Sequence, residues 1–210
     1  MKPDLILFPD ASLKRSGDKF FSGYGVVILN THTGNYTTVK GSLSKDSIVY
    51  CEAWAIYQGL RFIEHLRKKQ YPKGTNLKVL VVSDSKINIQ IFTTWIKKSW
   101  DLSDWYDWKK SDKTSVRNQE LYRNIMKVLS NGHLKVKFVH INSHSDKKPG
   151  MMKHIESKLE KANVNVNYQT LTTFIELNQV ADALACSVTE KSKRGSKIET
   201  EFQTLIHKGE

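Results

Sequence analysis

Apolar and polar residues follow one another near the start of the chain in a pattern that predicts three short strands. The strands cover residues 5–8, 23–29 and 36–43, and polar turns separate them. This order is typical of an antiparallel meander. Because proline cannot donate a hydrogen bond to a strand ladder, Pro9 predicts that regular pairing of the first strand stops there.

Longer apolar segments follow, and their spacing predicts helices that alternate with two more strands. Helices are expected at residues 47–70, 86–98, 116–129 and 178–191, and strands at residues 77–82 and 134–141. Ser47 is a typical residue to begin a helix, and Pro72 with Gly74 is a typical stop. A meander followed by alternating helices and strands predicts an α/β domain with a mixed five-stranded sheet flanked by helices.

Two segments lie outside this alternation. Residues 146–177 form an insertion with one helical piece at about residues 151–161. Apolar residues at helical spacing mark that piece: Met152, Ile155 and Leu159. Residues 191–210 are a charged tail, so we expect one domain over residues 1–190 followed by that tail.

Four acidic residues stand in, or at the end of, apolar segments that are expected to be buried. They are Asp10, Glu52, Asp84 and Asp182, and no lysine or arginine lies within those apolar runs. One unpaired buried carboxylate costs several kcal/mol. The simplest physical solution is that the four converge and share divalent cations, which indicates a metal-dependent nuclease as the leading hypothesis.

The position of Glu52 is the most specific of the four. It lies on the core-facing stripe of its helix with Ile48, Ile56, Leu60 and Ile63. An acid there is paired or coordinates an ion, although a glutamate at the edge of the stripe can also reach solvent.

The three aspartates have ordinary alternatives when each is taken alone. Asp10 and Asp84 each end a predicted strand, where aspartate is a common turn or cap residue. If those strands are parallel neighbours, both carboxylates emerge side by side at the edge where α/β sheets bind ligands. Asp182 lies beside the apolar stripe of the last helix, and a solvated side chain is the alternative for it.

Composition adds a partner class and a compartment. The net charge of +12 over 210 residues attracts polyanions, most often nucleic acid, although a basic proteome or a need for solubility gives the same charge. No apolar stretch is long enough to span a membrane, and the start of the chain does not read as a signal peptide. The two cysteines lack metal-site spacing, so we expect free thiols and a cytoplasmic location.

In order along the chain, the acids and their neighbours resemble the bacterial ribonuclease H family (type 1). The matching residues are Asp10-Ala11-Ser12, Gly23, Gly25, Glu52-Ala53, Ser83-Asp84-Ser85, His144, Asn178, Ala181-Asp182 and Leu184-Ala185. The resemblance covers residues 4–190 and implies a ribonuclease H-like fold. It also implies that the four acids are metal ligands and that His144 assists proton transfer or product release.

The segment 95–122 is similar to the basic handle of that family. The residues expected to contact nucleic acid there are Trp95, Lys97, Lys98, Trp108, Lys109, Lys110 and Asn118. Flat aromatic rings stack on sugars or bases while lysines neutralise phosphates, so the chemistry agrees with the resemblance. Packing of the tryptophans within the handle is the alternative.

Three departures from the family pattern bear on selectivity. Ile48 and Val49 stand where the family usually has an asparagine pair, Ser143 replaces a glycine, and about 33 residues separate His144 from Asn178. We expect residues 146–177 to fold as a small helical flap beside the active site.

The resemblance implies an endoribonuclease that cleaves the RNA strand of RNA–DNA hybrids with two Mg²⁺ ions, with Mn²⁺ as a possible substitute. A monomer without membrane association is expected. Two alternatives stay open: a nuclease of the same fold that acts on other structured nucleic acid, and a non-catalytic nucleic-acid-binding module.

Overall fold

In the computed structural model, residues 1–104, 107–142, 150–194 and 200–205 are described. The sheet contains strands β1 (Leu5–Ser16), β2 (Lys19–Asn30), β3 (Tyr36–Leu43), β4 (Leu77–Ser83), β5 (Leu134–His140) and β6 (Glu201–Leu205). Their spatial order is β5-β4-β1-β2-β3-β6. The first three strands pair antiparallel, whereas β4 and β5 run parallel to β1. The predicted five-stranded mixed sheet is therefore confirmed, with a sixth strand added at the β3 edge.

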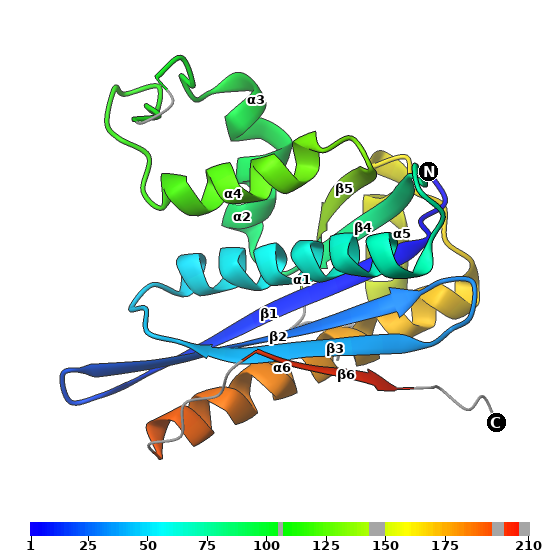
Figure 1. Ribbon diagram of the computed structural model, residues 1–210, viewed down its shortest axis with the longest axis horizontal. Coiled ribbons are helices and arrows are strands. Elements are labelled where there is room, and N and C mark those ends of the chain that lie inside the picture. Colours follow the sequence, from blue (N-terminus) through cyan, green and yellow to red (C-terminus); the bar gives the residue numbers. More distant parts are fainter. Residues whose placement is uncertain (105–106, 143–149, 195–199, 206–210) are drawn as a thin grey trace.

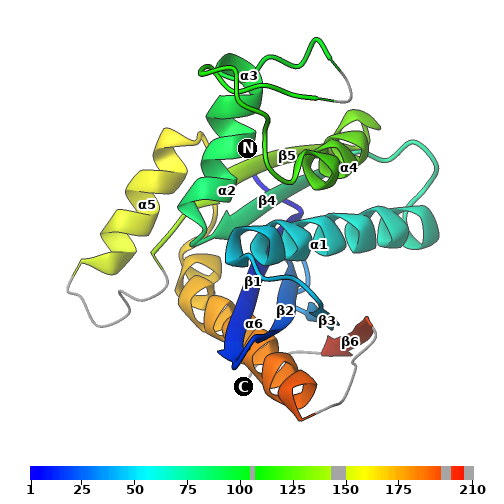
Figure 2. The ribbon, with the colours of Figure 1, turned by 90° about the vertical axis from the view of Figure 1, so that its left-hand side faces the viewer.

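Helices cover both faces of the sheet (Figures 1 and 2). They are α1 (Ile48–Gln70), α2 (Lys86–Gln90), α3 (Ile96–Lys98), α4 (Gln119–Ser130), α5 (Met151–Lys161) and α6 (Tyr168–Lys193). A π-helical turn, Ile91–Trp95, joins α2 to α3, so the helix predicted at residues 86–98 is continuous but locally widened. The α1, α2 and α4 helices lie on one face, and α5 and α6 lie on the other.

Alternating side chains of β1 supply both layers of the core. Leu7 joins the cluster beneath α1, whereas Ile6 and Phe8 join the cluster beneath α5 and α6. Asp10 continues the series of Ile6 and Phe8, so its side chain lies on the α6 face of the sheet.

Pairing of β1 does not stop at Pro9, which corrects the prediction from the sequence. The antiparallel ladder with β2 continues to Ser16. On its other side, β1 pairs with β4 only from Leu5 to Leu7. A proline is tolerated there because β1 has lost its β4 neighbour by that point. Asp10 consequently lies beyond the last pair of the β1–β4 ladder, where the edge of the sheet opens.

The first helix matches its prediction closely. The Ser47 hydroxyl accepts a hydrogen bond from the Tyr50 backbone N–H at 3.4 Å, and the helix ends before Tyr71. Ile56 and its successors on the stripe are fully buried, but Ile48 is 39% exposed. Ile48 therefore belongs to the surface at the start of α1 and not to the core.

The helix predicted at residues 178–191 begins ten residues earlier, at Tyr168. Leu171, Phe174 and Leu177 are buried and continue the stripe of Ala181. Threonines between them have low helix propensity and hide this pattern in the sequence. Part of the predicted insertion is thus the first half of the long α6 helix.

The predicted helical piece of the insertion is α5, and it is fixed to the body of the protein. Ile155 and Leu159 are 1% and 3% exposed, in the same cluster as Val139 of β5 and Phe174 of α6. The helix is confirmed, and it packs on the sheet as a core element. The loop of residues 143–149 before it lies outside the described residues.

The tail contains a strand, β6, that the sequence pattern did not predict. Residues of β6 pair antiparallel with β3, and the Lys40 ammonium lies 3.1 Å from the Glu201 carboxylate. The Tyr24 hydroxyl also lies 2.8 Å from the Thr200 hydroxyl. The edge of the sheet is thereby covered over the length of β6.

Close approach of α6 to β2 depends on two glycines of that strand. A Cβ atom at Gly25 would meet the Ala181 carbonyl oxygen and lie 2.7 Å from Leu184 Cβ. A Cβ atom at Gly23 would lie 2.7 Å from the Ala185 carbonyl oxygen. These contacts are with backbone and rigid atoms, so nothing nearby can yield easily.

We expect Gly25→Ala to lower the free energy of unfolding by about 3 kcal/mol, because α6 must move away from the sheet. Activity should fall as well, since α6 carries Asp182. Urea denaturation measures the first effect. Lys73→Ala, at an exposed lysine between α1 and β4, is the control, because a surface substitution of this kind usually changes stability little. Equal stability of Gly25→Ala and the parent chain would contradict the close-packing account.

Candidate active site

Asp10 is the most deeply buried of the four acids, with 8% of its surface exposed. Its Oδ1 accepts a hydrogen bond from the Ala11 backbone N–H at 2.7 Å. Burial, as the largest cause, and the nearby charges of Asp84, Asp182 and Glu52 together raise the pKa of Asp10 to about 8, although the hydrogen bond from the Ala11 N–H opposes the rise. All four acids are therefore close enough to interact electrostatically around Asp10.

Glu52 projects from α1 toward the start of α2. Its Oε2 accepts hydrogen bonds from the Ser85 hydroxyl and, at 3.3 Å, from the Asn88 amide. Burial raises the pKa of Glu52 and the charge of Asp84 adds to the rise, while the bonds from Ser85 and Asn88 lower it. The predicted core-facing position of this side chain is consistent with its partial burial.

Asp84 and Asp182 complete the group from two further elements. Asp84 directly follows β4, and its carbonyl oxygen lies 3.1 Å from Nε2 of His140 on the neighbouring strand. Burial lowers the pKa of His140, which favours a neutral ring. Asp182 is exposed on α6, where the Cys186 thiol lies 3.5 Å from its Oδ1. The site thus has a buried floor and one exposed carboxylate at its rim.

Among the described residues, no three His, Cys, Asp or Glu side chains form a ready-made cage for one metal ion. Mutual repulsion of the carboxylates favours their separation from one another, and hydrogen bonds hold the Glu52 carboxylate toward α2. Mg²⁺ usually takes one or two carboxylates together with water and substrate phosphate, and does not need an all-protein cage. The purely oxygen donor set and the raised pKa of Asp10 both fit a divalent cation of this kind.

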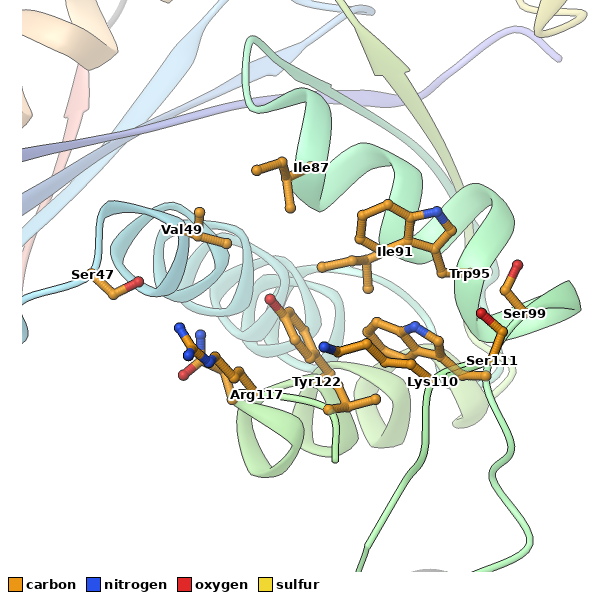
Figure 3. A pocket seen from close by; sticks show the side chains of 13 residues that line it. Ser47, Val49, Ile87, Ile91, Trp95, Ser99, Lys110, Ser111, Arg117 and Tyr122 are labelled. Atoms are coloured by element: carbon orange, nitrogen blue, oxygen red, sulfur yellow. The ribbon is translucent and has the colours of Figure 1, made fainter. Parts of the chain in front are cut away.

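A cleft of about 430 Å³ lies next to the acids, between the start of α1 and the handle. Figure 3 shows side chains from α1, from the α2–α3 helix and from the handle converging on it. Its lining includes Val49, three residues before Glu52, and Ile87, three residues after Asp84. The four carboxylates are not part of the lining, so the cleft adjoins the acidic group and does not contain it.

Three of the handle residues predicted from the sequence line this cleft: Trp95, Lys110 and Asn118. Trp95 is half-buried, and its ring centroid lies 6.1 Å from that of Trp100. Asn118 has φ of 59° at the start of α4. The cleft is also lined by residues that the sequence analysis did not single out, among them Arg117 and Tyr122. The helical spacing of Tyr122 from Asn118 is the feature that could have indicated it.

The other predicted handle residues lie elsewhere. Trp108 is 2% exposed and packs beneath Arg123, whose guanidinium lies 5.4 Å from the ring centroid, so Trp108 offers no surface for a contact. Lys109 forms an ion pair with Asp107. Lys97 and Lys98 are exposed, and Lys97 borders a separate apolar groove beside β5.

Of the remaining predicted features, His144 lies outside the described residues. Both cysteines are free, with Cys51 buried and Cys186 half-buried. Over the described part of the chain, no helix has the length and apolar character needed to cross a membrane.

Comparison with protein families finds a match to RNase H over residues 2–154. The match includes three of the four acids and ends before Asp182. A comparison with curated proteins finds no match.

Solved structures with the same fold include LC9-RNase H1, described as a type 1 RNase H with the type 2 active-site motif. It has a TM-score of 0.57 and 18% identity, over 91% of this chain and 74% of that chain. LC11-RNase H1 in complex with an RNA/DNA hybrid has a TM-score of 0.52 and 14% identity, over 90% of this chain and 99% of that chain. A foamy viral protease-reverse transcriptase in complex with RNA/DNA hybrid has a TM-score of 0.58 and 16% identity, over 90% of this chain and 20% of that chain.

Identities this low establish the fold alone, whereas the family match spans well over half of the chain. The sheet order, the helices on both faces and the acids at the open edge agree with that match. The chain therefore belongs to the ribonuclease H family, as its sequence resemblance predicted.

Proposed function

We propose that the protein is an endoribonuclease that hydrolyses the RNA strand of RNA–DNA hybrids with two divalent cations. The observation that carries this proposal is the electrostatic coupling of Asp84, Asp182 and Glu52 to Asp10 at the open edge of the sheet. A binding module would have no reason to hold four acids against a polyanion. Structural neighbours solved with RNA/DNA hybrids support the choice of substrate.

The metal ligands in this proposal are Asp10, Glu52, Asp84 and Asp182. Two Mg²⁺ or Mn²⁺ ions, when bound, supply activation of a water molecule and stabilisation of the leaving 3′ oxygen. The protein contributes by fixing the carboxylates: Asp10 through the Ala11 N–H, and Glu52 through Ser85 and Asn88. No nucleophilic serine or cysteine is required.

The hybrid is proposed to bind across the acids and the adjoining cleft, with Trp95, Lys110 and Asn118 as contacts and Lys97 and Lys98 as flanking charges. Ile48 is exposed at the start of α1. The asparagine pair that the family usually has at this position would read the minor groove. Selectivity for the hybrid must then come from backbone groups or from other side chains. We further propose that the enzyme acts as a monomer in the cytoplasm, and its free cysteines support that reducing compartment.

Lys110→Ala is expected to weaken hybrid binding and to reduce the slope of log affinity against log salt by about one. Turnover at saturating hybrid should stay the same, because Lys110 is not one of the proposed metal ligands. Binding titrations over a range of salt concentrations measure the slope. Lys73→Ala, at an exposed lysine between α1 and β4, is the matched control. Equal slopes for both variants would show that the hybrid docks elsewhere.

His144→Ala is expected to lower kcat by about 10- to 100-fold with little change in KM, because the role that the family resemblance implies for this imidazole is to carry a proton or loosen product and not to build the metal site. Single-turnover and steady-state kinetics separate the two steps. Unchanged kcat would remove His144 from the mechanism.

A further inference from the structure

Asn88 is a fully buried polar residue on α2, with no exposed surface. Its Nδ2 lies 2.9 Å from the Ser85 hydroxyl, 3.1 Å from the Val49 carbonyl oxygen and 3.3 Å from Glu52 Oε2. The Ser85 hydroxyl in turn donates to Glu52 Oε2. The Asn88 amide therefore links the start of α1, the loop after β4 and the Glu52 carboxylate.

The orientation of this amide is fixed by its surroundings. Nδ2 faces a carbonyl oxygen, a carboxylate oxygen and a hydroxyl whose proton is already used, and all three accept hydrogen bonds. A flipped amide would place Oδ1 against these three acceptors, one of them the Glu52 carboxylate. An amide nitrogen has two protons, so three acceptors more than saturate it and the side chain has no freedom to turn.

The arrangement is costly for folding alone. Asn88 Oδ1 is buried and has no hydrogen-bond partner among the described residues. A buried unsatisfied acceptor is unfavourable, and an apolar residue of the same shape would avoid the cost. Ile89 and Ile91, its neighbours on the helix, are buried apolar residues of this kind. The position of an asparagine here is better explained by its effect on Glu52.

We propose that Asn88 is a positioning residue that, with Ser85, holds the Glu52 carboxylate by Oε2 and so presents Oε1 to a divalent cation. This inference rests on the proposed function. Removing the group that hydrogen-bonds to a metal ligand typically weakens metal binding about 10- to 100-fold. Asn88 acts on Glu52 and not on substrate, so its effect is on metal affinity and kcat, with KM for the hybrid unchanged.

The test compares Asn88→Leu, which keeps the volume but removes the donor, with Asn88→Thr, which keeps a hydroxyl donor. Thermal unfolding is followed over a range of Mg²⁺ concentrations without substrate. Asn88→Leu should need about 10-fold more Mg²⁺ for half-maximal stabilisation, while Asn88→Thr should respond more like the parent chain. Kinetics at matched Mg²⁺ should show a lower kcat and an unchanged KM for Asn88→Leu.

Ile89→Val is the control for loss of packing on the same helix. It should lower the unfolding temperature but leave the Mg²⁺ response unchanged. An unshifted Mg²⁺ midpoint in Asn88→Leu, an equal shift in Ile89→Val, or no Mg²⁺ stabilisation of the parent chain would each overturn the inference. A Mg²⁺ response that depends on Asn88 in a protein without hybrid cleavage would leave it standing and reject the proposed function instead.

Discussion

Asp10→Asn is expected to lower hydrolysis of the RNA strand by about 1000-fold or more, equivalent to roughly 4 kcal/mol of transition-state stabilisation. Asp10 is the acid on which the other three act, so loss of its charge weakens cation binding more directly than any surface change. Cleavage of a labelled hybrid under saturating Mg²⁺ measures the loss. A turnover within about tenfold of the parent chain would remove Asp10 from the metal site.

The same variant should gain stability when metal is absent. Burial and neighbouring charge raise the pKa of Asp10 to about 8 from its ordinary value of 3.8. The folded protein therefore holds this proton to higher pH than the unfolded chain does, and stability falls as pH rises between those two values. Asparagine does not titrate, so it escapes this loss.

With a chelator present, the stability gain of Asp10→Asn should be near zero at about pH 4 and about 2 kcal/mol at about pH 8. The full shift in the pKa of Asp10 corresponds to a larger gain in stability, but relaxation of the site and entry of water reduce that gain. Urea denaturation at the two pH values provides the comparison. A gain that is the same at both would mean that charge burial is not its source.

Removal of divalent cations is expected to abolish cleavage altogether, because no other group in the proposed mechanism activates the attacking water. It should also destabilise the protein. A cation at about 100 times its Kd stabilises the folded state by about 2.7 kcal/mol per site. Differential scanning calorimetry with and without Mg²⁺ detects this, and the Asp10→Asn variant should lose most of the response. Full activity in excess chelator would exclude the two-metal proposal.

Much of the fold could be predicted because its patterns are local. The α1 helix has a capping serine, a regular apolar stripe and a Pro-Gly stop, and the observed helix follows all three. The β4 strand is mainly apolar, with Leu77, Val79, Leu80, Val81 and Val82 buried, as is typical of a strand covered on both faces. These features need no knowledge of distant contacts.

The misplaced elements depend on contacts between distant parts of the chain. Pro9 stays within a strand because the pairing of β1 with β4 has already ended at Leu7, which the local sequence does not show. The β6 strand is short and forms only because β3 offers an edge. Threonines hide the early start of α6 in the sequence. Burial of Phe174, on the face of the sheet that α5 and α6 cover, stabilises this first part of the helix.

The acids of the site were predictable, but their supports were not. Polar residues interrupting apolar runs mark Asp10, Glu52 and Asp84 in the sequence. Asn88 lies four residues after Asp84, and only the packing of α2 against α1 shows that its amide reaches Glu52. Trp108 was predicted as a contact but is buried, because an aromatic residue among lysines has the same sequence pattern whether it is buried or exposed.

One cleavage assay is the most direct test of the proposed hydrolysis of hybrids. An RNA–DNA hybrid labelled on the RNA strand is compared with duplex RNA and duplex DNA of the same sequence in Mg²⁺, using the parent chain and Asp10→Asn prepared side by side. The account predicts internal cleavage of the RNA strand in the hybrid alone, by the parent chain alone. Binding of the hybrid without cleavage, or cleavage of duplex DNA in preference to the hybrid, would contradict it.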